Sequence, residues 1–207
     1  MARYTDAKCR LCRRLGIKLF LKGKRCTSAK CPIDRKGAVP PGMRGTKVHS
    51  RLSEYGTQLK EKQKAKRIYG VLERQFKKYF LEARKVRGAS GEALLQILES
   101  RLDNIVYRLG FVNSRSIARQ LISHGHFLVN NKKVNIPSFR VKPGDIISIS
   151  AKGMKIPQIS ETFSEKSAII PEWLEKKAAI GKVKRLPKRE EIESDINEQL
   201  IVEFYSR

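Results

Sequence analysis

The order of apolar and polar residues predicts helices over residues 53–87, where helix-forming residues dominate. After Gly70, apolar side chains recur at helical spacing, while basic ones fall on the opposite side. Gly70 itself is expected to break the helix, because glycine is a poor helix former. The apolar side of the second helix consists of Leu72, Phe76, Tyr79, Phe80 and Ala83.

The most regular pattern lies in residues 101–150. Two short helices are predicted, the first ending at Gly110 and the second beginning at Asn113 or Ser114 and ending at Gly125. Their apolar positions follow the i, i+3, i+4, i+7 rule and are Leu102, Ile105, Val106 and Leu109, then Ile117, Ala118, Leu121 and Ile122.

Short strands are predicted after these helices. Residues 127–129 and 134–136 flank Asn130 and Asn131, which tolerate the backbone of a tight hairpin. The turn 142–145, Lys-Pro-Gly-Asp, leads into a third strand at 146–149. The sequence therefore predicts a small antiparallel sheet beside two helices.

Beyond residue 152 the periodicity weakens. Pro171 is expected to open a short helix that Gly181 ends. A final helix has Ile196, Leu200, Ile201 and Phe204 on one face, and it is expected to pack on the first helical region.

The predicted class is α+β, with an N-terminal segment that contains the cysteines, a mostly helical domain and an inserted small module of two helices and a short antiparallel sheet. The expected boundaries are 1–45 for the N-terminal segment and linker, 46–98 with 182–207 for the helical domain, 99–160 for the module and 161–181 for a connecting segment with a short helix.

The charge of the chain indicates which kind of partner it binds. The net charge is +25, and residues 1–90 carry 26 Lys and Arg against six Asp and Glu. Because the cations are spread over several elements, nucleic acid is favoured over a membrane surface, and solubility alone is a weaker explanation. With 40% hydrophobic residues the chain can form a core. It has no apolar run long enough for a transmembrane helix and no secretory h-region, so a reducing compartment is expected.

The four cysteines form two close pairs, Cys9 with Cys12 and Cys26 with Cys31. Two such pairs joined by a loop are typical of a tetrahedral thiolate site, and four thiolates leave no position for substrate. The sequence therefore predicts one structural zinc ion. Disulfides and an iron–sulfur cluster are the alternatives.

No arrangement typical of catalysis is found, and no enzyme activity is expected. The sequence has no GxGxxG, P-loop or GxSxG motif. His124 and His126 flank a glycine and are interpreted as hydrogen-bonding or phosphate-contacting groups, while Asp103 is interpreted as a charge partner of Arg101 or Arg108.

Several motifs resemble the bacterial small-subunit ribosomal protein four family over nearly the whole chain. They are RLDNIVYRLGF at 101–111, ARQLISHGH at 118–126, the turn at 142–145, SEYG at 53–56, RIYG at 67–70 and INEQLIVE at 196–203. The four cysteines resemble the zinc knot of the zinc-bearing branch. The resemblance also implies that residues 99–160 are the RNA-binding module of this family. One departure is PGMRG at 41–45, where the family has Gln-His between the glycines.

The resemblance implies a structural constituent of the small ribosomal subunit, in the cytoplasm and bound to the ribosome. It implies binding to the 5′ domain of 16S ribosomal RNA, nucleation of subunit-body assembly and a contribution to translational accuracy. The implied neighbours are ribosomal protein five and the path by which messenger RNA enters, with no membrane and no small-molecule substrate.

The alternatives are an RNA-modifying enzyme that carries the same module and a zinc-ribbon DNA-binding factor. The candidate RNA-binding residues are Arg13, Arg14, Arg44, Lys47, Arg51, Lys62, Lys66, Arg101, Arg108, Arg115, Ser116, Arg119, His124, Lys132 and Lys133.

Overall fold

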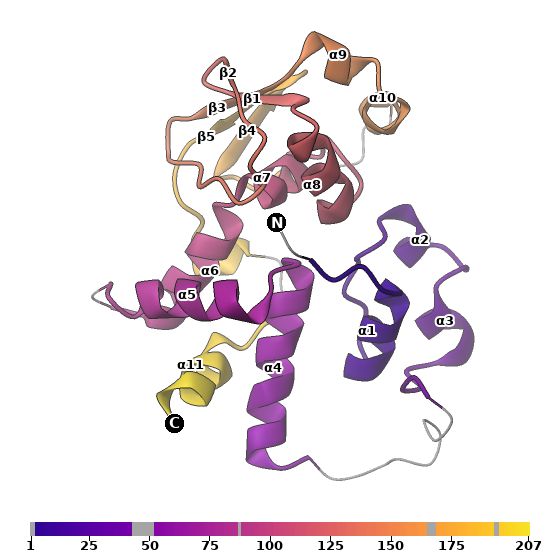
Figure 1. The fold of residues 1–207 in the computed structure, drawn as a ribbon, viewed down its shortest axis with the longest axis vertical. Coiled ribbons are helices and arrows are strands. Elements are labelled where there is room, and N and C mark those ends of the chain that lie inside the picture. Colours follow the sequence, from indigo (N-terminus) through magenta and orange to yellow (C-terminus); the bar gives the residue numbers. More distant parts are fainter. Residues whose placement is uncertain (1–2, 43–51, 87, 165–168, 193–194) are drawn as a thin grey trace. The chain divides into compact units, whose positions relative to one another are not determined.

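The computed structural model describes residues 3–42, 52–86, 88–164, 169–192 and 195–207. The chain divides into two compact units, Met1–Gly91 with Ser194–Arg207 and Glu92–Glu193. Figure 1 traces both units. The helices of the first unit are α1 (Lys8–Leu15), α2 (Lys24–Thr27), α3 (Pro32–Lys36), α4 (Glu54–Ile68), α5 (Glu73–Ala83) and α11 (Glu198–Ser206).

The first unit is built around α4, α5 and α11. Ser53 caps α4 by accepting a hydrogen bond from the Gly56 amide. The break after α4 is where the sequence predicts it, because Gly70 has a φ of 63°. The apolar side of α5 is buried, and the Tyr205 ring of α11 stacks on Phe80 with ring centroids 4.6 Å apart.

The N-terminal helices α1 to α3 enclose a small core of their own. Leu11, Cys12 and Leu19 are buried there, with Ile68 of α4 packed against them. So few apolar residues give little burial energy for residues 3–42, which is why a metal ion was expected to stabilise this segment.

The second unit places helices against a five-stranded antiparallel sheet of order β2-β1-β3-β5-β4. Its helices are α6 (Ser90–Glu99), α7 (Leu102–Arg108), α8 (Arg115–Ser123), α9 (Ala151–Met154) and α10 (Pro157–Ser164), with a 3-10 turn, η1 (Arg189–Glu191). Its strands are β1 (Phe127–Val129), β2 (Lys132–Lys133), β3 (Ile146–Ile149), β4 (Leu174–Lys177) and β5 (Ile180–Val183). The apolar faces of α7 and α8 meet the inward residues of the strands in one core.

The α+β class with an antiparallel sheet is confirmed, but the expectation for 161–181 is wrong. The segment after Pro171 forms β4 and β5 rather than a short helix, and Gly181 lies inside a strand. Leu174, Gly181 and Val183 alternate toward the core, while the intervening lysines hide this pattern in the sequence. Residues 182 and 183 therefore belong to the sheet, and the first unit resumes at 194 rather than 182. Most of α6 also lies in the second unit instead of the helical domain.

The hairpin is tighter than predicted. Asn130 and Asn131 both have positive φ, 50° and 63°, so they form a two-residue turn and pairing begins at Lys132. The second strand is therefore 132–133, not 134–136. No helix in the described part of the chain is long and apolar enough to cross a bilayer.

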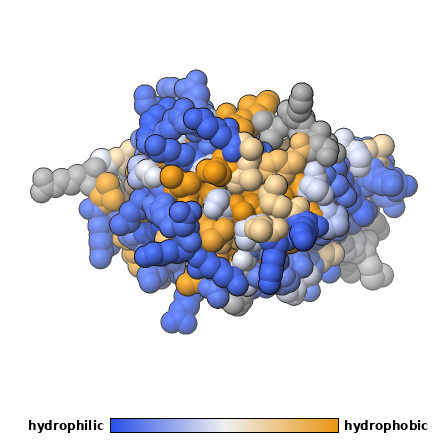
Figure 2. All heavy atoms as spheres, turned by 90° about the horizontal axis from the view of Figure 1, so that it is seen from above, coloured by the Kyte–Doolittle hydropathy of each residue, from blue (hydrophilic) through white to orange (hydrophobic). Residues whose placement is uncertain are grey.

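The outer side of the sheet is exposed. Ile146 of β3 and Ile180 of β5 are about half exposed, and Lys182 lies opposite Ile146 in the register. Figure 2 shows a face of the molecule on which hydrophobic residues gather in the middle and hydrophilic residues surround them.

Candidate RNA interface and metal centre

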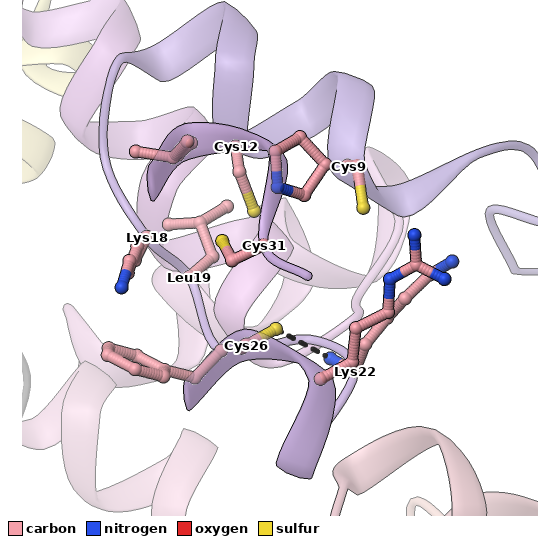
Figure 3. A pocket seen from close by; sticks show the side chains of 11 residues that line it. Cys9, Cys12, Lys18, Leu19, Lys22, Cys26 and Cys31 are labelled. Atoms are coloured by element: carbon pink, nitrogen blue, oxygen red, sulfur yellow. Dashed lines mark hydrogen bonds between the residues drawn. The ribbon is translucent and has the colours of Figure 1, made fainter. Parts of the chain in front are cut away.

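The four cysteines surround one pocket. Cys9 and Cys12 are one helical turn apart on α1, Cys26 lies on α2, and Cys31 immediately precedes α3. Figure 3 shows the sulfurs of Cys12 and Cys31 pointing toward each other, with Cys9 farther out. The sequence predicted that the two pairs come together, and the structure places both pairs on the same pocket.

Without a cation, the pocket favours the neutral thiol of Cys12. Burial raises the pKa of this thiol, and the three other cysteines raise it further, so a bound cation would be needed to hold it as a thiolate. Cys26 Sγ accepts a hydrogen bond from the Lys22 amide at 3.4 Å. Among the residues that the structure describes, no three His, Cys, Asp or Glu side chains stand together as a metal-binding group. The zinc ion therefore stays a prediction.

The predicted RNA contacts near this pocket have different surroundings. Arg13 donates hydrogen bonds to the backbone oxygens of Val39 and Pro40, at 2.8 and 3.2 Å, so it fastens α1 to the segment after α3. Arg14 is exposed. The expected contacts Arg44, Lys47 and Arg51 lie outside the described residues.

Lys62 and Lys66 of α4 form ion pairs inside the first unit. Both donate to the Glu73 carboxylate, at 2.8 and 2.9 Å. Lys62 is 5% exposed, and its ammonium lies 4.2 Å from the Phe204 ring centroid. Lys62, which was predicted as an RNA contact, is thus buried, because its ammonium pairs with Glu73 and lies against a ring of α11. Its contact with RNA stays a prediction.

The second unit contains a buried polar network centred on Glu99, which is 1% exposed. Its carboxylate accepts hydrogen bonds from Asn104 Nδ2 at 2.6 Å and from Arg108 Nη2 at 3.0 Å. Asn104 Oδ1 in turn accepts from Arg115 Nε at 2.7 Å. This network links the end of α6 to α7 and to the first turn of α8.

Asp103 anchors a second buried group. Arg101 Nε donates to it at 3.0 Å, and Arg119 Nη1 lies 3.8 Å from its Oδ2. The interpretation of Asp103 as a charge partner is confirmed. Arg101, Arg108 and Arg119 were predicted as RNA contacts, and the structure places all three side chains almost buried against carboxylates. Their contact with RNA stays a prediction. The sequence did not show that Glu99 of α6 is the carboxylate partner of Arg108 on α7.

Arg115 and Ser116 lie at the start of α8 and remain partly exposed. Ser114 caps this helix by accepting a hydrogen bond from the Ile117 amide. The Arg115 guanidinium lies 4.4 Å from the Tyr107 ring centroid, so its plane is held in place. The N-terminus of α8 thus combines a helix dipole with a fixed cation, which favours an anion.

His124, Lys132 and Lys133 are exposed at the hairpin end of the second unit. Gly125 has a φ of 75°, and a Cβ there would lie 2.9 Å from Lys133 Nζ. The glycine therefore lets the lysine side chain pass close to the turn. His124 and His126 have ring centroids 6.1 Å apart.

Sequence reasoning missed a group of exposed cations on α5 and just after it. They are Arg74, Lys77, Lys78, Arg84 and Lys85. Their helical spacing was visible in the sequence, but it did not separate them from cations that the fold neutralises.

Comparison with known families covers most of the chain. The family described as Ribosomal protein S4/S9 N-terminal domain matches residues 3–99, and the S4 domain matches residues 100–147. The chain belongs to the uS4 family of small ribosomal subunit proteins.

Individual uS4 relatives align over their whole length. The "Small ribosomal subunit protein uS4" of Dictyoglomus turgidum is 57% identical, and that of Natranaerobius thermophilus is 53% identical, each with complete coverage of both chains. The "Small ribosomal subunit protein uS4A" of Clostridium botulinum is 55% identical with the same coverage. The S4 domain match spans α7, α8 and the hairpin, so it includes the group around Asp103 and the exposed cations beside it. Glu99 is the last residue of the first match, and its partners on α7 lie in the second.

Proposed function

We propose that this chain is a structural, ribosomal RNA-binding constituent of the small ribosomal subunit, and that it resides there. Membership of the uS4 family over the full length carries this proposal. Following the family resemblance, its site is the 5′ domain of 16S ribosomal RNA, where it nucleates assembly of the subunit body. Ribosomal protein five and the path of incoming messenger RNA are its neighbours, and translational accuracy depends on its position.

The residues divide into two roles in this proposal. Arg115, Ser116, His124, Lys132 and Lys133 meet phosphates, because their side chains reach solvent. The buried arginines shape the α7–α8 surface through their carboxylate partners. Recognition is of backbone shape, because the major groove of A-form RNA is too narrow for side chains to read.

The test is binding of the full chain to a transcript of the 16S 5′ domain over a range of salt concentrations. Each phosphate contact releases counterions, so affinity should fall steeply as salt rises. The variant K132Q/K133Q should bind less tightly and with a shallower salt dependence. The matched variant K152Q/K155Q, on and just after the exposed helix α9, controls for loss of net charge. A flat salt response of the parent chain would contradict the proposal.

We also propose that Cys9, Cys12, Cys26 and Cys31 hold one structural zinc ion. The donor set fits, because the four cysteines line one pocket and an adjacent amide already donates to Cys26 Sγ. A bound zinc ion supplies cross-linking between α1, α2 and α3, and it keeps the thiols deprotonated. Elemental analysis of the purified chain should give one zinc per chain. Iron in its place would indicate a cluster, and less than half an equivalent of either metal would contradict a metal site.

A further inference from the structure

Strand β4 forms one edge of the sheet in the second unit. Among the described residues it pairs with β5 and with no other strand. The Lys184 amide donates to the Trp173 oxygen at 2.9 Å, which fixes the hydrogen-bonding phase of this pair. Hydrogen-bonded and non-hydrogen-bonded positions alternate along an antiparallel pair. Glu175 and Lys177 therefore bond to β5, and the backbone amide and oxygen of Lys176 face the open edge.

An open edge of this kind can accept a strand from another chain. The outer face of the sheet beside β4 favours such a contact, because Ile180 and Ile146 are about half exposed there. A second copy of β4 could add in antiparallel orientation about a twofold axis, which is the commonest symmetry of protein dimers. The edge of β4 is therefore a site where two copies of this chain could join.

The side chain of Lys176 points to the inner face of this edge strand. Leu174, two residues earlier, is buried in the core, and residues two apart in a strand share a face. The Lys176 ammonium lies 5.0 Å from the Phe111 ring centroid and 4.9 Å from that of Phe163. It donates a hydrogen bond of 3.2 Å to the Gly110 oxygen. A cation thus occupies a position where the strand pattern calls for an apolar residue.

This position deprives the ammonium of part of its hydration. Burial lowers the pKa of Lys176, since the charged form loses solvation there. Two aromatic rings and one carbonyl offset part of the loss, and within the described part of the chain no carboxylate pairs with the ammonium. The side chain is still partly exposed, so water completes its solvation. A strand added at the edge would cover this side chain and bury a charge without a counter-ion, which is strongly unfavourable.

We infer that Lys176 keeps the edge of β4 from pairing with β4 of a second copy of this chain. The inward ammonium reaches water past the open edge, and pairing would close that route. The second copy would also bring its own Lys176 to the same place, so two cations would lie close together in a region of low dielectric constant. This role belongs to the free protein and does not depend on the proposed RNA binding.

The test compares three full-length chains without RNA: the parent, K176M and K177M. Methionine is apolar, unbranched and favourable beside aromatic rings, so K176M should keep the fold. Lys177 is the next residue of β4 and its side chain is 85% exposed, so K177M controls for the loss of one charge. In sedimentation velocity at increasing concentration, the mass of K176M should rise toward that of a dimer, while the parent and K177M stay monomeric. The melting temperature of K176M should equal or exceed that of the parent.

Hydrogen exchange and a further variant identify the surface that pairs. In K176M, the amide of residue 176 should exchange more slowly as the concentration rises, because it then donates to the second copy. Lys176→Pro removes the same charge together with this amide, and proline is accepted where the amide of an edge strand faces solvent. K176P should therefore stay monomeric under conditions in which K176M associates.

Four results would overturn the inference. A monomeric K176M would show that the edge does not pair even without the cation. Equal association of K177M would assign the effect to net charge, and equal association of K176P would assign it to another surface. An unfolded K176M would show that the cation serves the fold of the second unit instead of guarding its edge.

Discussion

Tyr205 donates a hydrogen bond of 2.8 Å to Glu73 Oε1, although 132 residues separate the two in the chain. The bond joins α11 to the first turn of α5, where Lys62 and Lys66 also reach the same carboxylate. Burial and this hydrogen bond raise the pKa of Tyr205, so the phenol stays a donor. The contact explains how a short acidic helix is held on a basic unit.

Replacing Tyr205 with Phe should lower the free energy of unfolding of the first unit by about 1–2 kcal/mol, because a hydrogen bond to a charged acceptor is lost. Tyr55→Phe is the matched control, since its ring also packs on Phe204 but its side chain is half exposed. The free energy of unfolding of each variant relative to the parent is measured by urea titration, with hydrogen exchange of the α5 amides as the readout. Equal stability of the two variants would show that the ring contacts alone hold α11.

Acid should weaken the same contact. Burial raises the pKa of Glu73, but hydrogen bonds from Lys62, Lys66 and Tyr205 outweigh it and lower the pKa from 4.5 to about 2. Because the folded pKa lies below the unfolded one, this stabilisation is present above about pH 4.5 and is lost as the pH falls toward 2.

The contribution of Glu73 should be about 1 kcal/mol once solvent screening of this partly exposed group is allowed for. Unfolding free energies at pH 5, 4 and 3 should therefore fall more steeply for the parent than for Glu73→Gln. Parallel pH profiles for the two proteins would contradict the assigned cause.

Removing Glu99 should be far more costly than removing a surface acid. Glu99→Ala leaves Arg108 buried without its carboxylate, which costs about 3–5 kcal/mol. Glu175→Ala is the control in the same unit, because its ion pair with Lys177 is at the surface, where solvent screens it and its loss should change stability little. Thermal and urea unfolding compare them, and a loss below 1 kcal/mol for Glu99→Ala would mean that water replaces the carboxylate.

Gly181 is predicted to tolerate no side chain. A Cβ at this position in β5 would lie 2.8 Å from Cδ2 of Leu109, the buried residue after α7, so the Leu109 side chain would have to move within a closely packed core. Gly181→Ala should cost about 1–3 kcal/mol by overpacking. At Gly56 of α4 nothing comes nearer than 3.4 Å, and Gly56→Ala should leave stability equal or slightly higher. Similar losses in both variants would contradict the steric cause.

Removing the proposed zinc ion should loosen one part of the chain only. With a strong chelator, amides of residues 3–42 should exchange faster, because their small core cannot fold this segment alone. Amides of α7, α8 and β1 should keep their protection, since they share a separate core. Hydrogen exchange read by mass spectrometry distinguishes these regions. Unchanged exchange in α1 would contradict a stabilising metal.

Helices were easier to predict from the sequence than the strands and the charge pairs. The i, i+3, i+4 pattern of α5, α7 and α8 reflects local geometry, and Ser114 caps α8 at one of the two positions expected. Strands β4 and β5 were not predicted, because strands of four residues with lysines on the outer side show only a weak alternation of apolar and polar residues.

The candidate site was only partly predictable for a related reason. The cysteine spacing located a pocket, because closely spaced pairs on short helices have little freedom. Asp103 could be matched with Arg101 because they are two residues apart, whereas the partner of Arg108 is Glu99, on another helix. Exposure, which decides whether a cation can meet phosphate, is a property of the whole fold.

The split of the first unit has a consequence for the order in which the chain acquires its structure during synthesis. Gln58 of α4 donates a hydrogen bond to Glu203 of α11, 145 residues later, so the partner of α4 leaves the ribosome long after α4 itself. The second unit is contiguous and can fold before α11 exists. Once the second unit has folded, the chain between α5 and α11 is compact and no longer long and flexible. Less conformational entropy is then lost when α11 docks on α4 and α5. In a nascent chain of this protein, α4 and α5 therefore lack their third helix until α11 has been synthesised.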